Sequence, residues 1–472
     1  MTSNLVVILS DEHQSRAMGC AGLPFVKTPN LDALAARGTR FTNAYTPSPI
    51  CVPARASFAT GLYPHQTRCW DNAMPYEGQI PSWGHCLQGA GISVESIGKL
   101  HYREKSNTAG FDEEHVPMYV VNGVGMVWGS IRDPERRITP SQRMLGDYIG
   151  PGESNYTRYE RAVTDRTVEW LGSHADDEAP WCLYVGLVAP HFPLVVPQEF
   201  FDLYPAESLP SPKLDPRDGY VRHPWVELQN SQMDSDINFT SDDERRAAAS
   251  AYYGLVSWMD HNVGRIVAAL EANGLLDNTT IIYSSDHGDN VGARGMWGKS
   301  TFYEESVSIP MIMAGPDVPV GTCETAVDLL DVSAYIPHHF GLPFECEGEP
   351  LTEITKRGDD PNRVVFSEYH AFGAVSGAFM IRKGRWKLNH YVGFEPELFD
   401  LEADPEEASN LAGDTSYAAI LADLMSELHS IVDPDATNAQ AFADQAAMIE
   451  SYGGIEAALK LGAPNATPPP KV

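Results

Sequence analysis

Short continuous runs of apolar and β-branched residues constrain the fold most strongly. They lie at residues 5–9, 182–188, 280–285 and 363–367, and they do not alternate with polar residues along their length. A strand that is buried on both faces needs such a run, and parallel strands covered by helices are buried in this way. The sequence therefore predicts an α/β fold with a large, mostly parallel central sheet flanked by helices.

Helix signals separate these runs. Thr28-Pro29 begins a helix that Gly38 ends, and Pro53 begins a helix that ends at Gly61. Apolar residues at helical spacing predict two longer helices over 156–174 and 243–272. The alternation of strands and helices supports the α/β prediction.

The sequence changes character near residue 375. Apolar runs at 378–382 and 385–388 flank Lys383-Gly384, which predicts an antiparallel hairpin, and a helix is expected at 417–431. Residues 103–155 and 205–242 show little periodicity, so we expect long surface insertions there. We expect an α/β domain over 1–374, a smaller α+β subdomain over 375–433, and a tail over 434–472 that is loose or packed on another subunit of a homo-oligomer.

Charge and cysteine content exclude several classes of protein. The formal net charge of −31 argues against binding to nucleic acid, which favours basic proteins. No apolar run is long enough to cross a membrane. Seven cysteines without a paired pattern favour a reducing compartment, and residues 1–10 lack the marks of a secretory leader. We therefore expect a cytoplasmic protein.

Cys51 is the candidate nucleophile. Pro53 places it at the start of a helix, where backbone N–H groups favour negative charge. Arg55 lies four residues further on and therefore shares the same helix face. These residues alone support equally well a small buried cysteine beside an unrelated arginine.

Three polar residues follow predicted strands and suggest a metal site. Asp11 follows the first strand, and Asp286 and His287 follow the strand at 280–285. Open α/β sheets place their sites at the carboxyl ends of strands, and carboxylate and imidazole groups bind divalent cations. Taken alone, the Asp286-His287-Gly288 segment is better explained as a polar turn after a strand.

Four basic residues are candidates for binding an anion. Lys99 and His101 are two residues apart, which puts them on one face if the strand before them continues. His191 stands between Pro190 and Phe192-Pro193, and Lys299 follows a glycine-rich loop. Singly, each residue is better explained as a surface or structural residue.

The segment around Cys51 resembles a known family signature. Residues 46–57 (Thr-Pro-Ser-Pro-Ile-Cys-Val-Pro-Ala-Arg-Ala-Ser), followed by Thr60-Gly61, resemble the signature of type I sulfatases of the alkaline phosphatase superfamily. Ala54 stands where many members have serine. Residues 28–32, 41–45, 397–401, 404–405 and 410–411 resemble further segments of the family in the same order.

The resemblance implies an alkaline-phosphatase-like fold and an arylsulfatase-type hydrolysis of a small-molecule sulfate ester. It implies that a formylglycine-generating enzyme oxidises Cys51 to formylglycine, and that one divalent metal ion, Ca²⁺ with Mn²⁺ as an alternative, is bound. The implied roles are metal ligands (Asp11, Cys51, Asp286, His287), sulfate binding (Asn72, Lys99) and catalysis (Cys51, Arg55, His101, His191, Lys299). Whether Glu12 is a further ligand stays open.

Other functions remain open at this point. The chain resembles most the choline sulfatases and the neighbouring phosphonate monoester hydrolases, so choline sulfate, a phosphonate monoester or a phosphodiester are alternative substrates. An inactive interaction protein on the same scaffold should have lost Cys51, Arg55 or a metal ligand, and this chain has kept them all.

Overall fold

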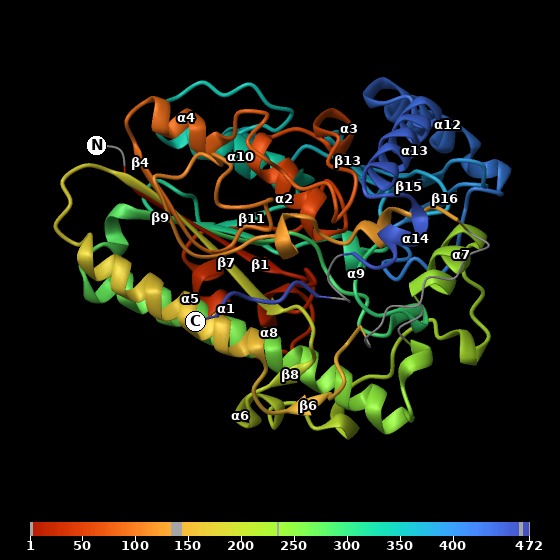
Figure 1. Cartoon of the computed structure of the whole chain (residues 1–472), viewed down its shortest axis with the longest axis horizontal. Helices are drawn as coiled ribbons and strands as arrows, with labels where there is room; N and C mark the ends of the chain where they lie inside the picture. Colours follow the sequence, from red (N-terminus) through yellow and green to blue (C-terminus); the bar gives the residue numbers. More distant parts are fainter. Residues whose placement is uncertain (1–2, 134–143, 234–235, 462–465, 472) are drawn as a thin grey trace.

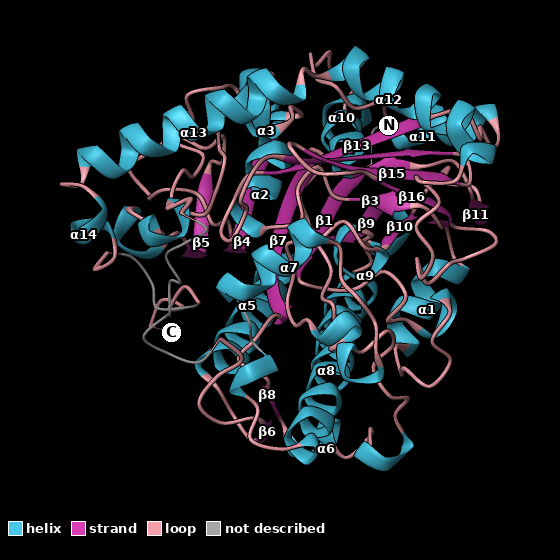
Figure 2. Ribbon diagram, turned by 90° about the vertical axis from the view of Figure 1, so that its right-hand side faces the viewer, coloured by secondary structure: helices cyan, strands magenta, loops and turns pink. Residues whose placement is uncertain are grey.

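The fold is built on one large sheet with helices on both faces (Figures 1 and 2). The computed structural model describes residues 3–133, 144–233, 236–461 and 466–471. In these ranges the large sheet has eight strands: β1 (Asn4–Asp11), β2 (Thr39–Phe41), β4 (Ser93–Lys99), β5 (Glu113–Met118), β7 (Trp181–Pro190), β9 (Thr279–Ser285), β10 (Met311–Ala314) and β11 (Gly321–Cys323).

The strand order is β11-β2-β10-β9-β1-β7-β4-β5. Strand β10 runs antiparallel to both of its neighbours, and the other neighbouring pairs are parallel. This topology confirms the predicted mostly parallel α/β sheet. Strands β1, β7 and β9 match the predicted runs to within a few residues.

Strand β1 shows why its sequence is apolar throughout. Val6 and Ile8 pack into the hydrophobic core on one face of the sheet, while Leu5, Val7 and Leu9 pack into the core on the other. The first face is covered by α1 (Pro29–Ala36), α5 (Asn155–Ser173) and α8 (Asp242–Ala272), and the second by α2 (Cys51–Thr60), α4 (Trp83–Gly89) and α10 (Leu329–His339). Helix α2 begins at Cys51 itself, two residues before the predicted start at Pro53.

A second, antiparallel sheet lies beside the first. It contains β13 (Val364–Tyr369), β14 (Ala378–Lys383), β15 (Trp386–Tyr391) and β16 (Glu397–Asp400), and α12 (Ala418–Ile431) packs on it. The predicted hairpin and helix are therefore confirmed. The prediction for 363–367 was wrong in one respect: this strand pairs with β14 and not with the central sheet, so the small sheet begins before residue 375.

The two predicted insertions contain regular structure. Strand β5 lies within 103–155 and pairs with β4 at the edge of the central sheet, so that segment is not only a surface insertion. Helix α7 (Pro224–Met233) lies within 205–242 and buries Trp225. The remaining short elements are α3 (Pro64–Thr67), α6 (Gln198–Phe201), α9 (Glu304–Val307), α11 (Leu351–Arg357), β3 (Ala44–Tyr45), β6 (Gly150–Pro151), β8 (Val195–Val196) and β12 (Val327–Asp328).

The C-terminal segment packs on its own chain. Its described part forms α13 (Pro434–Ser451) and α14 (Ile455–Ala458), which pack on the rest of the chain, so the expectation of a loose tail is wrong for these helices, and a contact with another subunit stays a prediction. The Gln445 side chain donates from Nε2 to Asp71 Oδ2 at 2.6 Å and to the carbonyl oxygen of His370 at 2.8 Å. The expected homo-oligomer stays a prediction. Among the described residues, no helix is long and apolar enough to cross a membrane.

Candidate active site

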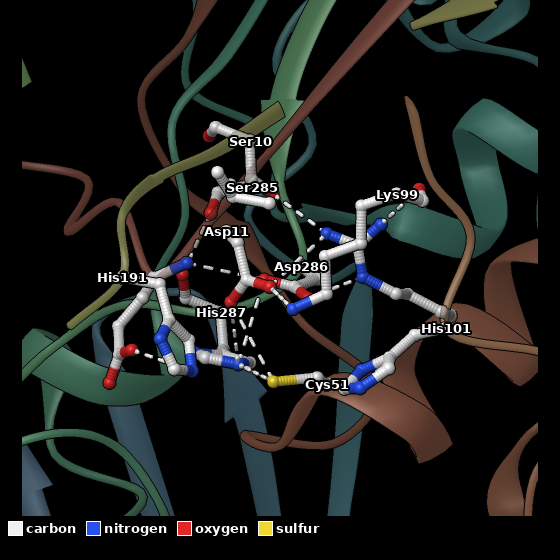
Figure 3. A network of polar contacts seen from close by, with 12 residues as sticks. Ser10, Asp11, Cys51, Lys99, His101, His191, Ser285, Asp286 and His287 are labelled. Atoms are coloured by element: carbon white, nitrogen blue, oxygen red, sulfur yellow. Dashed lines mark hydrogen bonds and ion pairs between the residues drawn. The ribbon is translucent and has the colours of Figure 1, made fainter. Parts of the chain in front are cut away.

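The predicted site residues meet at the carboxyl ends of four neighbouring parallel strands (Figure 3). Asp11 ends β1, Lys99 ends β4, His191 follows β7, and Asp286 and His287 follow β9. The start of α2 brings Cys51 to the same place. The parallel order of β9, β1, β7 and β4 therefore gathers residues that lie far apart in the sequence.

Four side chains around Cys51 form a possible metal site. One ligand atom from each of Asp11, Cys51, Asp286 and His287 lies within 4.8 Å of the other three. Cys51 Sγ lies 3.1 Å from His287 Nε2 and 3.6 Å from Asp11 Oδ1. His287 Nδ1 lies 3.0 Å from the carbonyl oxygen of Gly288, which can accept a hydrogen bond from Nδ1–H. In that arrangement the lone pair of Nε2 faces the cluster. Two carboxylates and a neutral imidazole suit a divalent cation.

The unmodified thiol is poorly suited to act as a nucleophile. Burial and then the nearby Asp11 carboxylate raise the pKa of Cys51 to about 12. The thiolate is the reactive form of cysteine. In this environment of protein side chains, the thiolate of Cys51 is therefore disfavoured at neutral pH.

The guanidinium group of Arg55 is buried, and it contacts other residues of the site. Its Nε donates to Asp286 Oδ2 at 2.7 Å, and one terminal nitrogen lies 3.6 Å from Asp11 Oδ2. The other donates to the carbonyl oxygen of Lys99 and to the hydroxyl of Tyr184. Burial opposes ionisation of Asp11, but the charges of Lys99, His191 and Arg55 outweigh it and hold the Asp11 pKa well below its usual value. Arg55 thus positions the two carboxylates that lie nearest to Cys51.

Lys299 forms hydrogen bonds to both His191 and Glu12. Its Nζ donates to His191 Nε2 at 2.8 Å and to Glu12 Oε2 at 3.0 Å. Burial and then the Lys299 charge hold the pKa of His191 well below its usual value, so the ring is neutral. His191 Nδ1 donates to the carbonyl oxygen of Phe192 at 2.5 Å, which fixes Nε2 as the acceptor.

Glu12 belongs to the site, as its sequence position beside Asp11 suggested. Its Oε1 atom is buried and has no hydrogen-bond partner among the described residues. Its backbone φ is 72°, a left-handed conformation that is rare for residues other than glycine and that often marks a functional site. Glu12, Asp11 and His191 form a second group of possible metal ligands.

Lys99 and His101 both line the pocket over Cys51, but not as two residues of one strand. Strand β4 ends at Lys99, and His101 has a left-handed φ of 59°, so the expected continuation of the strand was wrong. Lys99 Nζ forms an ion pair with Asp11 Oδ2. The turn in the backbone, and not strand periodicity, brings His101 beside Cys51 (Figure 3).

Asn72 caps the helix that carries Cys51. Its Oδ1 accepts the backbone N–H of Val52 at 3.1 Å, so its amide NH₂ is the group left to donate to an anion. The outer wall of the same pocket is mostly apolar. It is formed by Met126, Trp128, Met144, Tyr156, Phe192, Phe372 and Ala466.

Sequence reasoning missed three residues that support the site. Tyr184 lies in the middle of β7 and binds Arg55. Glu160 on α5 accepts the backbone N–H groups just before His191. Thr467 reaches His101 from the C-terminal segment. None of them stands in a motif, and only the fold brings them to the site.

Comparisons with known proteins identify the family of the chain. A family model described as Sulfatase matches residues 3–342, and one described as N-sulphoglucosamine sulphohydrolase, C-terminal, matches residues 292–433. A choline-sulfatase of Rhizobium meliloti (strain 1021) is 33% identical over an alignment of 428 residues that covers 87% of this chain and 82% of that protein. An arylsulfatase of Clostridium perfringens (strain 13 / Type A) is 28% identical over an alignment of 452 residues that covers 88% of this chain and 92% of that protein.

A solved structure shows the same fold. The phosphonate monoester hydrolase of Agrobacterium radiobacter superposes with a TM-score of 0.72 at 22% identity, covering 93% of this chain and 96% of that one. At that identity the likeness concerns the fold alone. The Sulfatase model, in contrast, matches more than half of the sequence. The chain belongs to the sulfatase family of sulfuric ester hydrolases.

Proposed function

We propose that this chain hydrolyses sulfate monoesters with a formylglycine made from Cys51 and a divalent cation held by Asp11, Asp286 and His287. The observation that carries the proposal is the meeting of these four side chains within 4.8 Å at the start of α2. The helix N-terminus and the cationic side chains around the pocket favour an anionic group there.

Two groups would supply the central chemistry. A bound Ca²⁺ or Mn²⁺ would stabilise negative charge beside residue 51, and formylglycine hydrate would offer one hydroxyl for attack and one for release of the product. Arg55 forms ion pairs with the Asp11 and Asp286 carboxylates and holds them beside residue 51, where they would bind the cation. Lys99 and the NH₂ group of Asn72 donate to the non-bridging oxygens of the sulfate.

We assign His191 and Lys299 to the stabilisation of the leaving oxygen. Lys299 Nζ lies within hydrogen-bond distance of both His191 Nε2 and Glu12 Oε2, and these contacts hold its charge in the pocket. Burial opposes the charge of Lys299, but the acidic groups around it, Glu12 and Asp11 among them, raise its pKa above the usual value. Lys299 therefore stays charged and stabilises the developing oxyanion.

The wall of the pocket indicates the kind of leaving group. Trp128 and Phe372 line the pocket, and their ring centroids lie 4.8 Å apart in an edge-to-face pair. Such rings bind aryl groups by stacking and quaternary ammonium groups by cation–π attraction. Aryl sulfates and choline sulfate are thus the preferred substrates, and the relation to a choline-sulfatase agrees with the second.

A phosphonate monoester hydrolase is the second candidate. The superposition on such an enzyme supports it, because sulfate and phosphonate groups are both tetrahedral and fit one pocket. The substrates differ in charge and in the second ester group, so kinetics separates them.

The test compares kcat/KM for an aryl sulfate, choline sulfate and an aryl phosphonate monoester. The enzyme is co-expressed with a formylglycine-generating enzyme, and mass spectrometry of the peptide containing residue 51 measures the conversion. Cys51→Ala should abolish turnover of every substrate. Higher kcat/KM for the phosphonate would select the second candidate, and full activity of Cys51→Ala would refute both.

A further inference from the structure

The C-terminal segment contributes to the wall of the active-site pocket. Ala466 and Thr467 line the same cavity as Cys51, and Thr467 is only 5% exposed. The carbonyl oxygen of Thr467 accepts the hydroxyl of Tyr156 at 2.7 Å, which anchors the segment to α5. Tyr156 also packs against the His191 ring, with centroids 5.6 Å apart.

Thr467 makes a direct hydrogen bond to His101. Its Oγ1 lies 2.8 Å from His101 Nε2. The other ring nitrogen, Nδ1, is buried and has no hydrogen-bond partner among the described residues. The His101 ring and Cys51 line the same pocket (Figure 3). Nε2 is thus hydrogen-bonded to the C-terminal segment, and Nδ1 is left to take part in proton transfer.

A neutral imidazole carries its proton on one nitrogen and a lone pair on the other. If Nε2–H donates to Thr467 Oγ1, Nδ1 is left with the lone pair and can accept a proton. If the proton is on Nδ1, the hydroxyl of Thr467 donates to the Nε2 lone pair instead, and Nδ1 cannot accept a proton. A partner that fixes the tautomer of a histidine therefore decides whether the residue can take part in proton transfer.

We propose that Thr467 is a positioning residue that holds His101 as the Nε2–H tautomer and thereby makes Nδ1 the base for product release. This inference rests on the function proposed above. In the release step, Nδ1 accepts the proton of the second hydroxyl of residue 51. The electron pair of that O–H bond forms the C=O bond of the aldehyde, the C–O bond to the sulfate breaks, and sulfate leaves with its oxygen and both electrons.

The proposal predicts which step slows when the hydrogen bond is lost. Attack on sulfur does not use His101, but release does. With a chromogenic aryl sulfate, Thr467→Val should release one equivalent of phenol per active formylglycine in a fast burst, followed by a slow steady state. Loss of such a supporting hydrogen bond typically costs about 10- to 100-fold in activity. We expect this loss in the steady-state kcat, whereas the rate of the burst should stay close to that of the wild type.

Matched variants separate this role from a structural one. Thr467→Ser keeps the hydroxyl and should restore kcat. Thr167→Val changes a buried threonine whose hydroxyl donates within α5 and should leave both phases unchanged. Thermal unfolding of each variant checks the fold. If Thr467→Val does not fold, Thr467→Ala is compared with Thr467→Ser in the same assay.

The outcomes also distinguish this inference from the proposed function. Wild-type kcat for Thr467→Val, or an equal slowing of burst and steady state, would overturn the role of Thr467 while the wild type stays active and Cys51→Ala stays inactive. If instead the wild type and Cys51→Ala show the same rate, the proposed function itself has failed.

Discussion

Replacing Glu160 with glutamine should remove part of the pH dependence of stability. Glu160 is fully buried on α5, and its Oε2 accepts the N–H groups of Val188 at 2.7 Å and Ala189 at 3.1 Å. These residues precede His191, so Glu160 supports the loop that carries it. Burial raises the pKa of Glu160 from 4.5 to about 7, and the two backbone N–H groups only partly oppose this.

The sign and size follow from linkage. Because the pKa is higher in the folded protein, the folded state binds the proton more tightly, and this stabilisation is complete below pH 4.5 and is lost as the pH rises through 7. A shift of this size corresponds to about 3 kcal/mol, of which about 2 kcal/mol is lost between about pH 5.5 and pH 9. Glutamine keeps an oxygen acceptor for the two N–H groups and does not ionise.

The assay is urea unfolding of the wild type and Glu160→Gln from about pH 5.5 to pH 9. Glutamine places an amide nitrogen at one oxygen position, which adds a constant cost at every pH, so the test is the change in the difference and not its absolute value. The free energy of unfolding of the wild type relative to the variant should fall by about 2 kcal/mol over this range. If the free energies of unfolding of the wild type and the variant change in parallel with pH, Glu160 does not take up a proton on folding, and the reasoning is wrong.

Three further changes test other parts of the site. Arg55→Lys should lower the free energy of unfolding by about 3–5 kcal/mol in urea, because two buried carboxylates lose a forked partner; Arg246→Lys on the surface is the control, and equal effects would contradict the role of Arg55. A chelator should lower Tm in a thermal scan and Ca²⁺ should restore it, because a cation binds only the folded site; the Tm of Asp286→Asn should respond less, and an unchanged wild-type Tm would argue against a bound metal. Asp444→Asn should cost less than about 1 kcal/mol in urea, because its ion pair with the largely exposed Arg68 is screened; a larger loss would mean that α13 depends on this pair.

The sequence predicted the parts of the site that local signals mark. Asp11, Asp286 and His287 directly follow apolar strands, and such positions in a parallel sheet must meet at one edge. Cys51 and Arg55 stand one helical turn apart. The structure brings these residues together as expected, because the end of an apolar run and the helical period are both visible in a short stretch of sequence, and parallel strands place their carboxyl ends at one edge.

Other parts could not be predicted because their contacts join distant segments. Tyr184 reads as one more apolar residue of β7, and its contact with Arg55 depends on how α2 lies on the sheet. Thr467 lies in a polar, proline-rich end of the chain with no periodicity. Strand β5 contains two glutamates and Pro117, which an edge strand tolerates because only one side of it is paired. Its sequence therefore lacks the apolar run by which the other strands were recognised.

If Cys51 is oxidised to formylglycine as proposed above, its burial sets a time limit on that modification. Its side chain is 1% exposed in the folded protein, so an enzyme that oxidises it must reach it before the site closes. Two of its neighbours, Asp286 and His287, follow β9, which begins at Thr279. At a synthesis rate of about 5–20 residues per second, the ribosome needs roughly ten to fifty seconds to proceed from Cys51 to that strand. The order of segments along the chain thus leaves an interval in which the cysteine is made but the strand that helps to enclose it does not yet exist.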